Sequence, residues 1–474
     1  MNTAQRVFLN TAVQIVARGF GLVVSLVVLR LTAGYLGVQA FGQLSIIIAL
    51  SELLRVLADF GVGTTLAREI AKSPGEADRL GGDLIVVRLV ASALAVFLAL
   101  AMIPLLPYSH ETKVGLALGL AGMFCMSVGT FPNAFFQTRL RLELQAALDM
   151  ATKVLNLGGI LLVRALSLGF YGVVGSFVIV NALICVLAFV LSRRFWRLNF
   201  TFDWSRVRVL TRDAVGIGAV SMVGLLHFKG DAILLSFLKP AKDVGIYSVA
   251  YRFIDQAFFL PGVFMAAMFP ILTRAIHSGT VAGEFAINRS FRVLLLGGVA
   301  VTVMAFVAAR PFVHLISSTQ FDEAVTPLRI LAFAIPFIFV GPVFYNAVIA
   351  VNRQRELIVI GIVALTFNVL LNLVLIPRYS YKGAAIATVI SEAFSCMASF
   401  AIAKRWIAFR IDRMFLIRAL VATAATAGVV ELTSDGSPWV VLAGAEAAFA
   451  VSAYGVGAVT RADLASVLKR VSTT

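Results

Sequence analysis

Seven basic side chains lie inside or at the edge of long apolar segments of this chain, where an ionised group is costly. They are Arg18, Arg30, Arg55, Arg88, Lys229, Arg252 and Arg329. An ionised side chain at the centre of a bilayer costs roughly 2.5–3.5 kcal/mol on insertion scales. Several such residues would be hard to tolerate against lipid, so we expect them to face the protein interior or a water-filled cavity.

Five of these residues are candidates for binding an anionic ligand: Arg18, Arg55, Arg88, Lys229 and Arg252. Arg18 and Arg88 have no acidic residue within one turn of their own predicted helices, which makes them the better candidates. A guanidinium group offers a fixed fork of donors and stays charged in a low dielectric. Several arginines around one cavity therefore suit a phosphate or a diphosphate.

Pairing within a helix is the alternative for two of the arginines. Arg55 has Glu52 three positions before it and Asp59 four positions after it. Arg252 has Asp255 three positions after it. Side chains at these spacings are neighbours on a helix and could neutralise each other without any ligand.

The remaining basic side chains have alternatives of their own. Lys229 could reach Asp231 or a neighbouring helix. Arg30 and Arg329 lie near the ends of apolar segments, where a long side chain can extend to the headgroup region.

The acidic residues in the same segments are matched by bases. They are Glu52, Asp59, Asp231, Asp255 and Glu392. A cation exporter would need uncompensated carboxylates and aromatic walls, so the balance favours an anionic substrate. Asp231, Asp255 and Glu392 are candidates for coupling transport to a gradient of H⁺ or Na⁺.

These charges fall on polar stripes along otherwise apolar helices, as a water-filled cavity requires. The predicted stripes are Asn10, Gln14, Arg18 and Ser25; Ser45, Glu52, Arg55 and Asp59; Gly224, His227 and Asp231; Ser248, Arg252 and Asp255; and Thr388, Glu392 and Ser395.

The elements that carry these residues are predicted to be transmembrane helices. The chain has 474 residues, 60% of them hydrophobic, and a mean hydropathy of +0.96. The apolar runs are continuous and about 20 residues long, which excludes the alternating pattern of a barrel. The sequence therefore predicts an all-α polytopic membrane protein with about fourteen transmembrane helices, their ends good to a few residues. The predicted spans are 9–32, 40–60, 83–106, 114–136, 153–168, 170–192, 213–238, 243–272, 291–310, 325–350, 356–376, 383–403, 412–430 and 438–459.

Basic residues in the connections indicate the orientation. About two thirds of the 40 Lys and Arg residues fall in alternate connections and at both termini, which places both termini in the cytoplasm. The longest basic connection, 193–212, carries Trp196 and Trp204 among its arginines. It is either a linker lying on anionic headgroups or a topogenic loop with interfacial tryptophans.

Two parts of the chain repeat each other. Gly42 matches Gly245 and Glu52 matches Asp255, and the members of both pairs are the same number of residues apart along the chain. At a second offset Gly172 matches Gly383. We therefore predict two six-helix lobes, residues 1–200 and 201–404, and an appended module of two helices and a cytoplasmic tail, residues 405–474. This organisation is typical of alternating-access transporters, with the site between the halves.

Other functional classes find little support in the sequence. No phosphate-binding G-x-x-x-x-G-K-[ST] loop is present, and the four histidines are scattered. Cys125, Cys185 and Cys396 lie in apolar runs and are expected to be packed hydrophobes. No metal site, cofactor, catalytic residue or nucleic-acid partner is predicted. Arg18 interrupts the first apolar run, so no cleavable signal peptide is expected.

Several motifs in order along the chain resemble a known family. They are Tyr35-Leu36-Gly37 with Phe41-Gly42, Ala58-Asp59-Phe60-Gly61-Val62-Gly63, Val244-Gly245-Ile246-Tyr247-Ser248, Asn368-Val369-Leu370-Leu371-Asn372, and Gly383-Ala384-Ala385-Ile386-Ala387-Thr388. Over residues 8–404 the chain resembles the polysaccharide flippases of the multidrug/oligosaccharidyl-lipid/polysaccharide exporter superfamily.

This resemblance implies a V-shaped fold of two six-helix lobes with two additional C-terminal helices. It implies a transporter, not an enzyme, that flips polyprenyl-diphosphate-linked oligosaccharide from the cytoplasmic to the outer leaflet by alternating access. Family members carry functional cations in the N-terminal lobe, where Arg18 and Arg55 match best. Asp231 lies where many relatives keep an acid.

The resemblance also implies a setting: a multi-pass protein of the bacterial inner membrane, working in polysaccharide biosynthesis. We expect a monomer, although the sequence does not reveal the oligomeric state. The partners of the protein would be the lipid-linked oligosaccharide, glycosyltransferases and a polysaccharide polymerase. An ion-coupled multidrug exporter of the same superfamily is the main alternative. A membrane enzyme such as a polymerase is a third hypothesis, but the short predicted outer connections argue against it.

Overall fold

The computed structural model describes residues 3–197, 200, 202–432 and 437–456, with side chains described from Gly19 onward except that of Pro438. Its elements are α-helices and short 3₁₀ helices, without a strand in these ranges. The first part of the chain forms α1 (Thr3–Asp59), α2 (Val62–Lys72), α3 (Ala77–Met102), α4 (His110–Gly129), α5 (Asn133–Thr138), α6 (Leu142–Ala165), α7 (Gly169–Ser192) and α8 (Trp204–Leu238). The second part forms α9 (Ala241–Ala257), α10 (Phe259–Ser278), α11 (Thr280–Val307), α12 (Ala309–Ile316), α13 (Val325–Ala332), α14 (Ile335–Ala350), α15 (Gln354–Trp406), α16 (Arg413–Leu432) and α17 (Pro438–Gly455). The short helices are η1 (Pro74–Glu76), η2 (Ile103–Leu105) and η3 (Thr319–Ala324).

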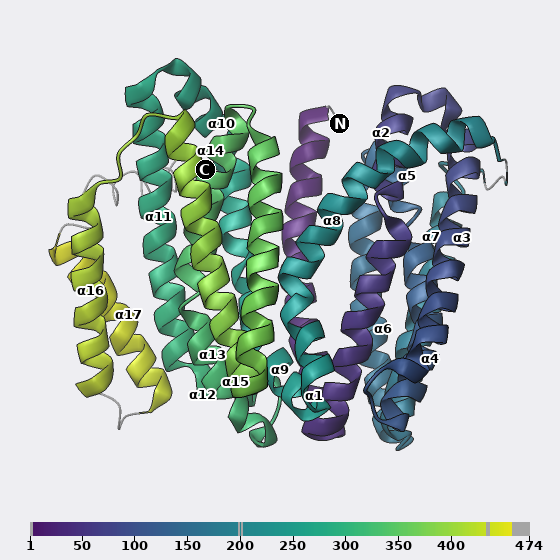
Figure 1. The fold of residues 1–474 in the computed structure, drawn as a ribbon, viewed down its shortest axis with the longest axis horizontal. Coiled ribbons are helices and arrows are strands. Elements are labelled where there is room, and N and C mark those ends of the chain that lie inside the picture. Colours follow the sequence, from purple (N-terminus) through teal and green to yellow (C-terminus); the bar gives the residue numbers. More distant parts are fainter. Residues whose placement is uncertain (1–2, 198–199, 201, 433–436, 457–474) are drawn as a thin grey trace. The chain divides into compact units, whose positions relative to one another are not determined.

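Helix α1 reverses direction at Gly37. A straight helix of its 57 residues would be roughly 85 Å long, against a hydrocarbon core of about 30 Å. Gly37 has φ 71° and ψ 176°, a conformation that residues with a Cβ rarely adopt. Figure 1 shows two limbs of α1 that run in opposite directions. The glycine thus divides α1 into two membrane-length limbs.

Helix α15 is divided in the same manner. Its 53 residues are interrupted at Ser380, which has φ 49° and ψ −132°, shortly after Pro377. The two limbs are joined by a hydrogen bond from Asn368 Nδ2 to Ser391 Oγ at 3.2 Å. The break therefore lies between two limbs that pack against each other.

The all-α, polytopic class is confirmed. Within the described ranges, eleven helical segments are long and apolar enough to cross a membrane, and the shorter helix 439–455 is also apolar. Two of the eleven contain the reversals at Gly37 and Ser380. The total of fourteen spans stays a prediction.

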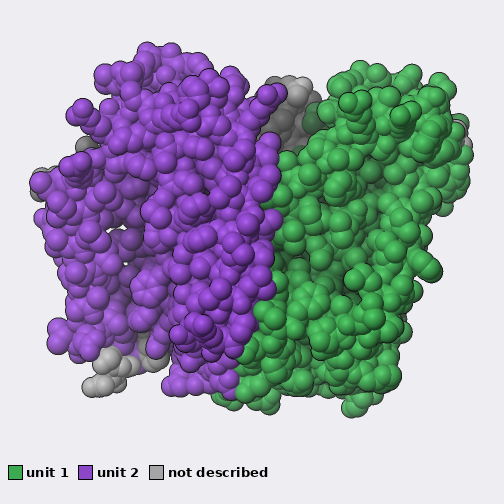
Figure 2. Space-filling view, viewed as in Figure 1, with its two compact units in different colours: residues 1–248, 316–320 green, residues 249–315, 321–474 purple. Residues whose placement is uncertain are grey.

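The chain forms two compact units, coloured separately in Figure 2. Unit 1 comprises Met1–Ser248 and Ile316–Gln320, and unit 2 comprises Val249–Leu315 and Phe321–Thr474. The chain passes from one unit to the other within α9. The predicted lobes 1–200 and 201–404 and the module 405–474 remain predictions.

Unit 1 is built on α1. Its limbs pack against α3, α4, α6, α7 and α8, while α4 packs against α7. Gly42 of α1 meets Gly245 of α9 so closely that a Cβ on Gly42 would lie 1.7 Å from the carbonyl oxygen of Ala241. The two glycines matched by the sequence repeat are therefore in direct contact within unit 1.

In unit 2, α14 packs against α10, α11 and α15, and α16 packs against α17. Helices α16 and α17 also contact α11. The last two helices thus lie on unit 2 through α11.

Trp196 is buried, which contradicts the interpretation that places it at the membrane interface. Its ring stacks on Phe135 with a centroid distance of 4.7 Å. It belongs to a core cluster that includes Leu66, Ile70 and Leu84. Trp204, in contrast, is exposed. Burial against α2, α3 and α5 decides the position of Trp196, and such packing does not follow from local sequence.

Candidate anion-binding site

The second limb of α1 ends in a tight turn that fixes Asp59. Phe60 and Gly61 follow with φ of 33° and 85°, both in the left-handed region. The Oδ1 atom of Asp59 accepts a hydrogen bond from the backbone N–H of Gly63 at 3.2 Å. Because the first N–H groups of a helix lack partners within the helix, this bond satisfies one of those at the start of α2.

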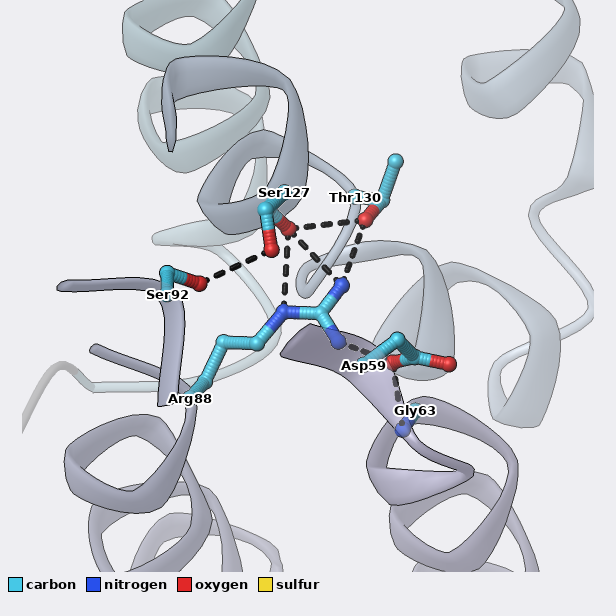
Figure 3. Close-up of polar contacts among 6 residues, drawn as sticks. All are labelled: Asp59, Gly63, Arg88, Ser92, Ser127 and Thr130. Carbon is cyan, nitrogen blue, oxygen red and sulfur yellow. Dashed lines mark hydrogen bonds and ion pairs between the residues drawn. The ribbon is translucent and has the colours of Figure 1, made fainter. Parts of the chain in front are cut away.

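Arg88 of α3 reaches this turn from a neighbouring helix. Its side chain is 2% exposed, and its Nη1 forms an ion pair with Asp59 Oδ1. Nε and Nη2 donate to the carbonyl oxygen of Ser127 at 3.0 and 2.8 Å, and Nη2 also donates to Thr130 Oγ1 at 2.8 Å. Figure 3 shows the guanidinium group surrounded by these acceptors.

The Arg88 contacts hold three helices together. Ser127 lies in the last turn of α4, where carbonyl groups lack partners within the helix. Ser92 of α3 adds a hydrogen bond of 2.8 Å to the hydroxyl of Ser127. The guanidinium group thus links α3 to the end of α4 and to the turn after α1. In this structure its donors are committed to protein acceptors.

Arg55 is held differently. Its Nη2 lies 2.7 Å from Glu52 Oε1, and its Nε lies 3.2 Å from Glu52 Oε2. The side chains of Arg55 and Glu52 are 21% and 30% exposed. The i,i+3 pairing considered as an alternative for Arg55 is therefore present, and it is accessible.

The two arginines belong to one series of charges. Glu52, Arg55 and Asp59 follow one another along α1, and Arg88 completes the series through Asp59. Asp59 attracts Arg55, whereas Arg55 and Arg88 carry the same charge and repel each other. The acids that lie between and beside the two arginines lower the cost of placing these ionised groups in transmembrane helices.

The other predicted residues of unit 1 lie on the N-terminal limb of α1 and on α8. The side chain of Arg18 lies outside the described residues. Asp231 is buried and accepts a hydrogen bond from the hydroxyl of Tyr247 at 3.1 Å. Lys229 is half-buried. Asp231 thus lies inside the protein, where a hydroxyl group of α9 donates a hydrogen bond to its carboxylate.

The remaining predicted residues belong to unit 2. Arg252 is exposed, and Asp255 is half-buried on the same helix. Glu392 is half-buried on the second limb of α15, next to the buried Ser391. The structure therefore brings Arg55 and Arg88 together in unit 1 and leaves Arg252, Asp255 and Glu392 as residues of unit 2.

Sequence reasoning missed the acceptors of Arg88. Helical spacing pairs Asp59 only with Arg55, on the same helix, and it gives no indication of Ser127 or Thr130. The signal available in the sequence was the Asp59-Phe60-Gly61 turn, which fixes a carboxylate at a helix end. In the part of the chain that is described, no group of three or more His, Cys, Asp or Glu side chains is arranged to hold a metal ion.

Comparison with known proteins agrees with a transporter. Residues 4–276, more than half of the chain, match the family described as polysaccharide biosynthesis protein, and residues 225–374 match the MatE family. The probable flippase AglR of Haloferax volcanii is 29% identical over 177 residues, which is 34% of each chain. That alignment spans only about a third of the length of this relative.

Solved structures share the fold. The structure of the lipid II flippase MurJ in an inward closed conformation superposes with a TM-score of 0.78 at 14% identity, covering 93% of this chain and 97% of that one. An inward-facing multidrug resistance MATE transporter of the MOP superfamily gives a TM-score of 0.64 at 16% identity, covering 81% and 94%.

The fold and the charged transmembrane helices define a multi-pass membrane transporter of the multidrug/oligosaccharidyl-lipid/polysaccharide exporter superfamily. Within that superfamily, the chain belongs to the polysaccharide biosynthesis protein family.

Proposed function

We propose that the protein flips polyprenyl-diphosphate-linked oligosaccharide from the cytoplasmic to the outer leaflet by alternating access, without catalysing a reaction. The observation that carries the proposal is Arg55, an accessible guanidinium group on a transmembrane helix in a chain of this family. A guanidinium fork in a low dielectric suits a diphosphate. The flippases AglR and MurJ among the similar proteins add support.

In this mechanism the sugar and diphosphate enter a polar cavity while the polyprenyl tail stays in the bilayer. Arg55 binds the diphosphate, with Arg18, Lys229 and Arg252 as further candidates. Arg88 contributes by holding the turn after Asp59, and direct contact of Arg88 with substrate stays a prediction. Asp231, Asp255 and Glu392 remain candidates for coupling to H⁺ or Na⁺.

The proposed setting is the bacterial inner membrane, with both termini in the cytoplasm. The protein would act as a monomer between glycosyltransferases that build the repeat unit and a polymerase that consumes it outside. No further cofactor is proposed.

An ion-coupled multidrug exporter is the second candidate. It is favoured by the MatE match over residues 225–374 and by the MATE transporter among similar structures. Against it, the described acids of α1 are paired with arginines, whereas organic cations are bound by uncompensated carboxylates and aromatic faces.

The two candidates are separated by one experiment. Cells lacking their own polysaccharide flippase are complemented with this protein, and the efflux of an organic cation dye is measured in parallel. Restored surface polysaccharide without dye efflux supports the flippase. Dye efflux without restored polysaccharide supports the exporter. A matched positive control, which flips the repeat unit of these cells, must restore polysaccharide in the same experiment.

A further inference from the structure

Glu52 binds the guanidinium group of Arg55 as an anionic ligand would. Nε and Nη2 donate to the two carboxylate oxygens at 3.2 and 2.7 Å. Two parallel N–H···O bonds are also the geometry by which arginine binds phosphate. One edge of the fork is therefore occupied by a carboxylate of the same helix.

The two ion pairs differ in the burial of their arginines. The carboxylates of Glu52 and Asp59 are similarly exposed, at 30% and 27%. Arg55 is 21% exposed, whereas Arg88 is 2% exposed and also bound to Ser127 and Thr130. Departure of Asp59 would leave a buried guanidinium group without its counterion, whereas the guanidinium group of Arg55 stays accessible to water and to a ligand. Glu52 is therefore the acid that can give up its place to a ligand.

Exchange at Arg55 requires little movement. Glu52 and Arg55 share one helix, so the carboxylate can rotate about its own side-chain torsions while the backbone of α1 stays in place. Among the described residues, the hydrogen bonds of the Arg55 side chain are those of Nε and Nη2 to Glu52, and none involves Nη1. A ligand can approach this nitrogen before the carboxylate leaves.

We propose that Glu52 is an exchangeable counterion that holds Arg55 while the site is empty and that the diphosphate of the substrate displaces. This inference rests on the proposed function, because it takes a diphosphate as the ligand. An incoming anion must compete with the Glu52 carboxylate for Arg55, and this competition makes the site selective. A more highly charged anion displaces Glu52, and a less charged anion does not. Glu52 is thereby a specificity-determining residue that favours diphosphate over monophosphate.

The test measures binding of two soluble lipid analogues, farnesyl diphosphate and farnesyl monophosphate, to the purified full-length protein in detergent. The variants are Glu52→Gln, Glu52→Ala, Glu52→Asp and Arg55→Gln. We expect Glu52→Gln and Glu52→Ala to bind both analogues more tightly, by about tenfold for the loss of one competing charged pair. The gain should be larger for the monophosphate. Glu52→Asp should resemble the wild type, and Arg55→Gln should lose most binding.

Glu143→Gln is the matched control, since it removes the acid of the exposed Arg141–Glu143 pair and should leave both affinities unchanged. Equal or weaker binding by Glu52→Gln and Glu52→Ala, with binding still dependent on Arg55, would overturn the counterion proposal and leave the proposed function standing. Absence of diphosphate binding in the wild type and all variants would contradict both.

Discussion

Arg88 of α3 and Asp59 at the end of α1 form an ion pair in which the guanidinium group is almost fully buried. The same guanidinium group binds the last turn of α4 through Ser127. The pair thus joins three helices of unit 1 at one point. It gives Arg88 a structural role that differs from that of the accessible Arg55.

Replacing Arg88 by alanine should destabilise the protein. Removing one partner of a fully buried ion pair costs about 3–5 kcal/mol because the other charge is left without compensation. The loss here should be smaller than that, because Asp59 is 27% exposed and can be solvated. Thermal unfolding of the purified variant in detergent measures the loss. Arg141→Ala, at an exposed pair, is the control and should change stability by about 0–1 kcal/mol. If Arg88→Ala keeps wild-type stability and loses only transport, Arg88 is a substrate contact instead.

The contact between Gly42 and Gly245 predicts that neither position accepts a side chain. A Cβ on Gly42 would lie 1.7 Å from the backbone oxygen of Ala241, and one on Gly245 would lie 2.6 Å from that of Val38. Gly42→Ala and Gly245→Ala should each destabilise by about 1–3 kcal/mol, or abolish accumulation in the membrane. Gly34→Ala, on the same helix, meets no neighbouring atom within 4 Å and should be neutral or stabilising. Normal yield and stability of both close-contact variants would show that the helices lie farther apart.

The buried Asp83 should hold the end of the connection between α7 and α8, together with the start of α8, onto α3. Its carboxylate accepts from Arg206 Nη1 at 2.7 Å and from the backbone N–H of Asp203 at 3.2 Å. Asp83→Ala should release this connection and speed trypsin cleavage at Arg193 and Arg194, as followed by gel electrophoresis. Glu76→Ala, at an exposed position, serves as the control. Cleavage at the wild-type rate in Asp83→Ala would mean that other contacts fix the connection.

Much of the fold could be predicted because hydrophobicity and charge act locally. Continuous apolar runs predict transmembrane helices. The glycine at position 37 and the proline at 377 mark the neighbourhoods in which α1 and α15 reverse. The Glu52–Arg55 pair follows from helical spacing alone, and the structure has it.

The partners of Arg88 could not be found in this way. Asp59 lies on another helix, and Ser127 contributes a backbone oxygen that every residue possesses. The burial of Trp196 likewise depends on Phe135 and on the close approach of Gly81. Tertiary contacts of this kind are set by packing between distant elements, and no local pattern encodes them.

Arg55 is proposed to bind the diphosphate of a lipid-linked oligosaccharide that the protein moves between leaflets. The most direct test reconstitutes the protein with fluorescent polyprenyl-diphosphate oligosaccharide in vesicles and follows the label that becomes accessible to an external quencher. We expect the wild type to accelerate movement over protein-free vesicles. Arg55→Gln, at wild-type thermal stability, should slow it at least about tenfold, the effect of losing one charge-assisted contact. Equal rates for wild type and Arg55→Gln would contradict the role of Arg55, and no movement by a stable wild type would contradict the flippase function.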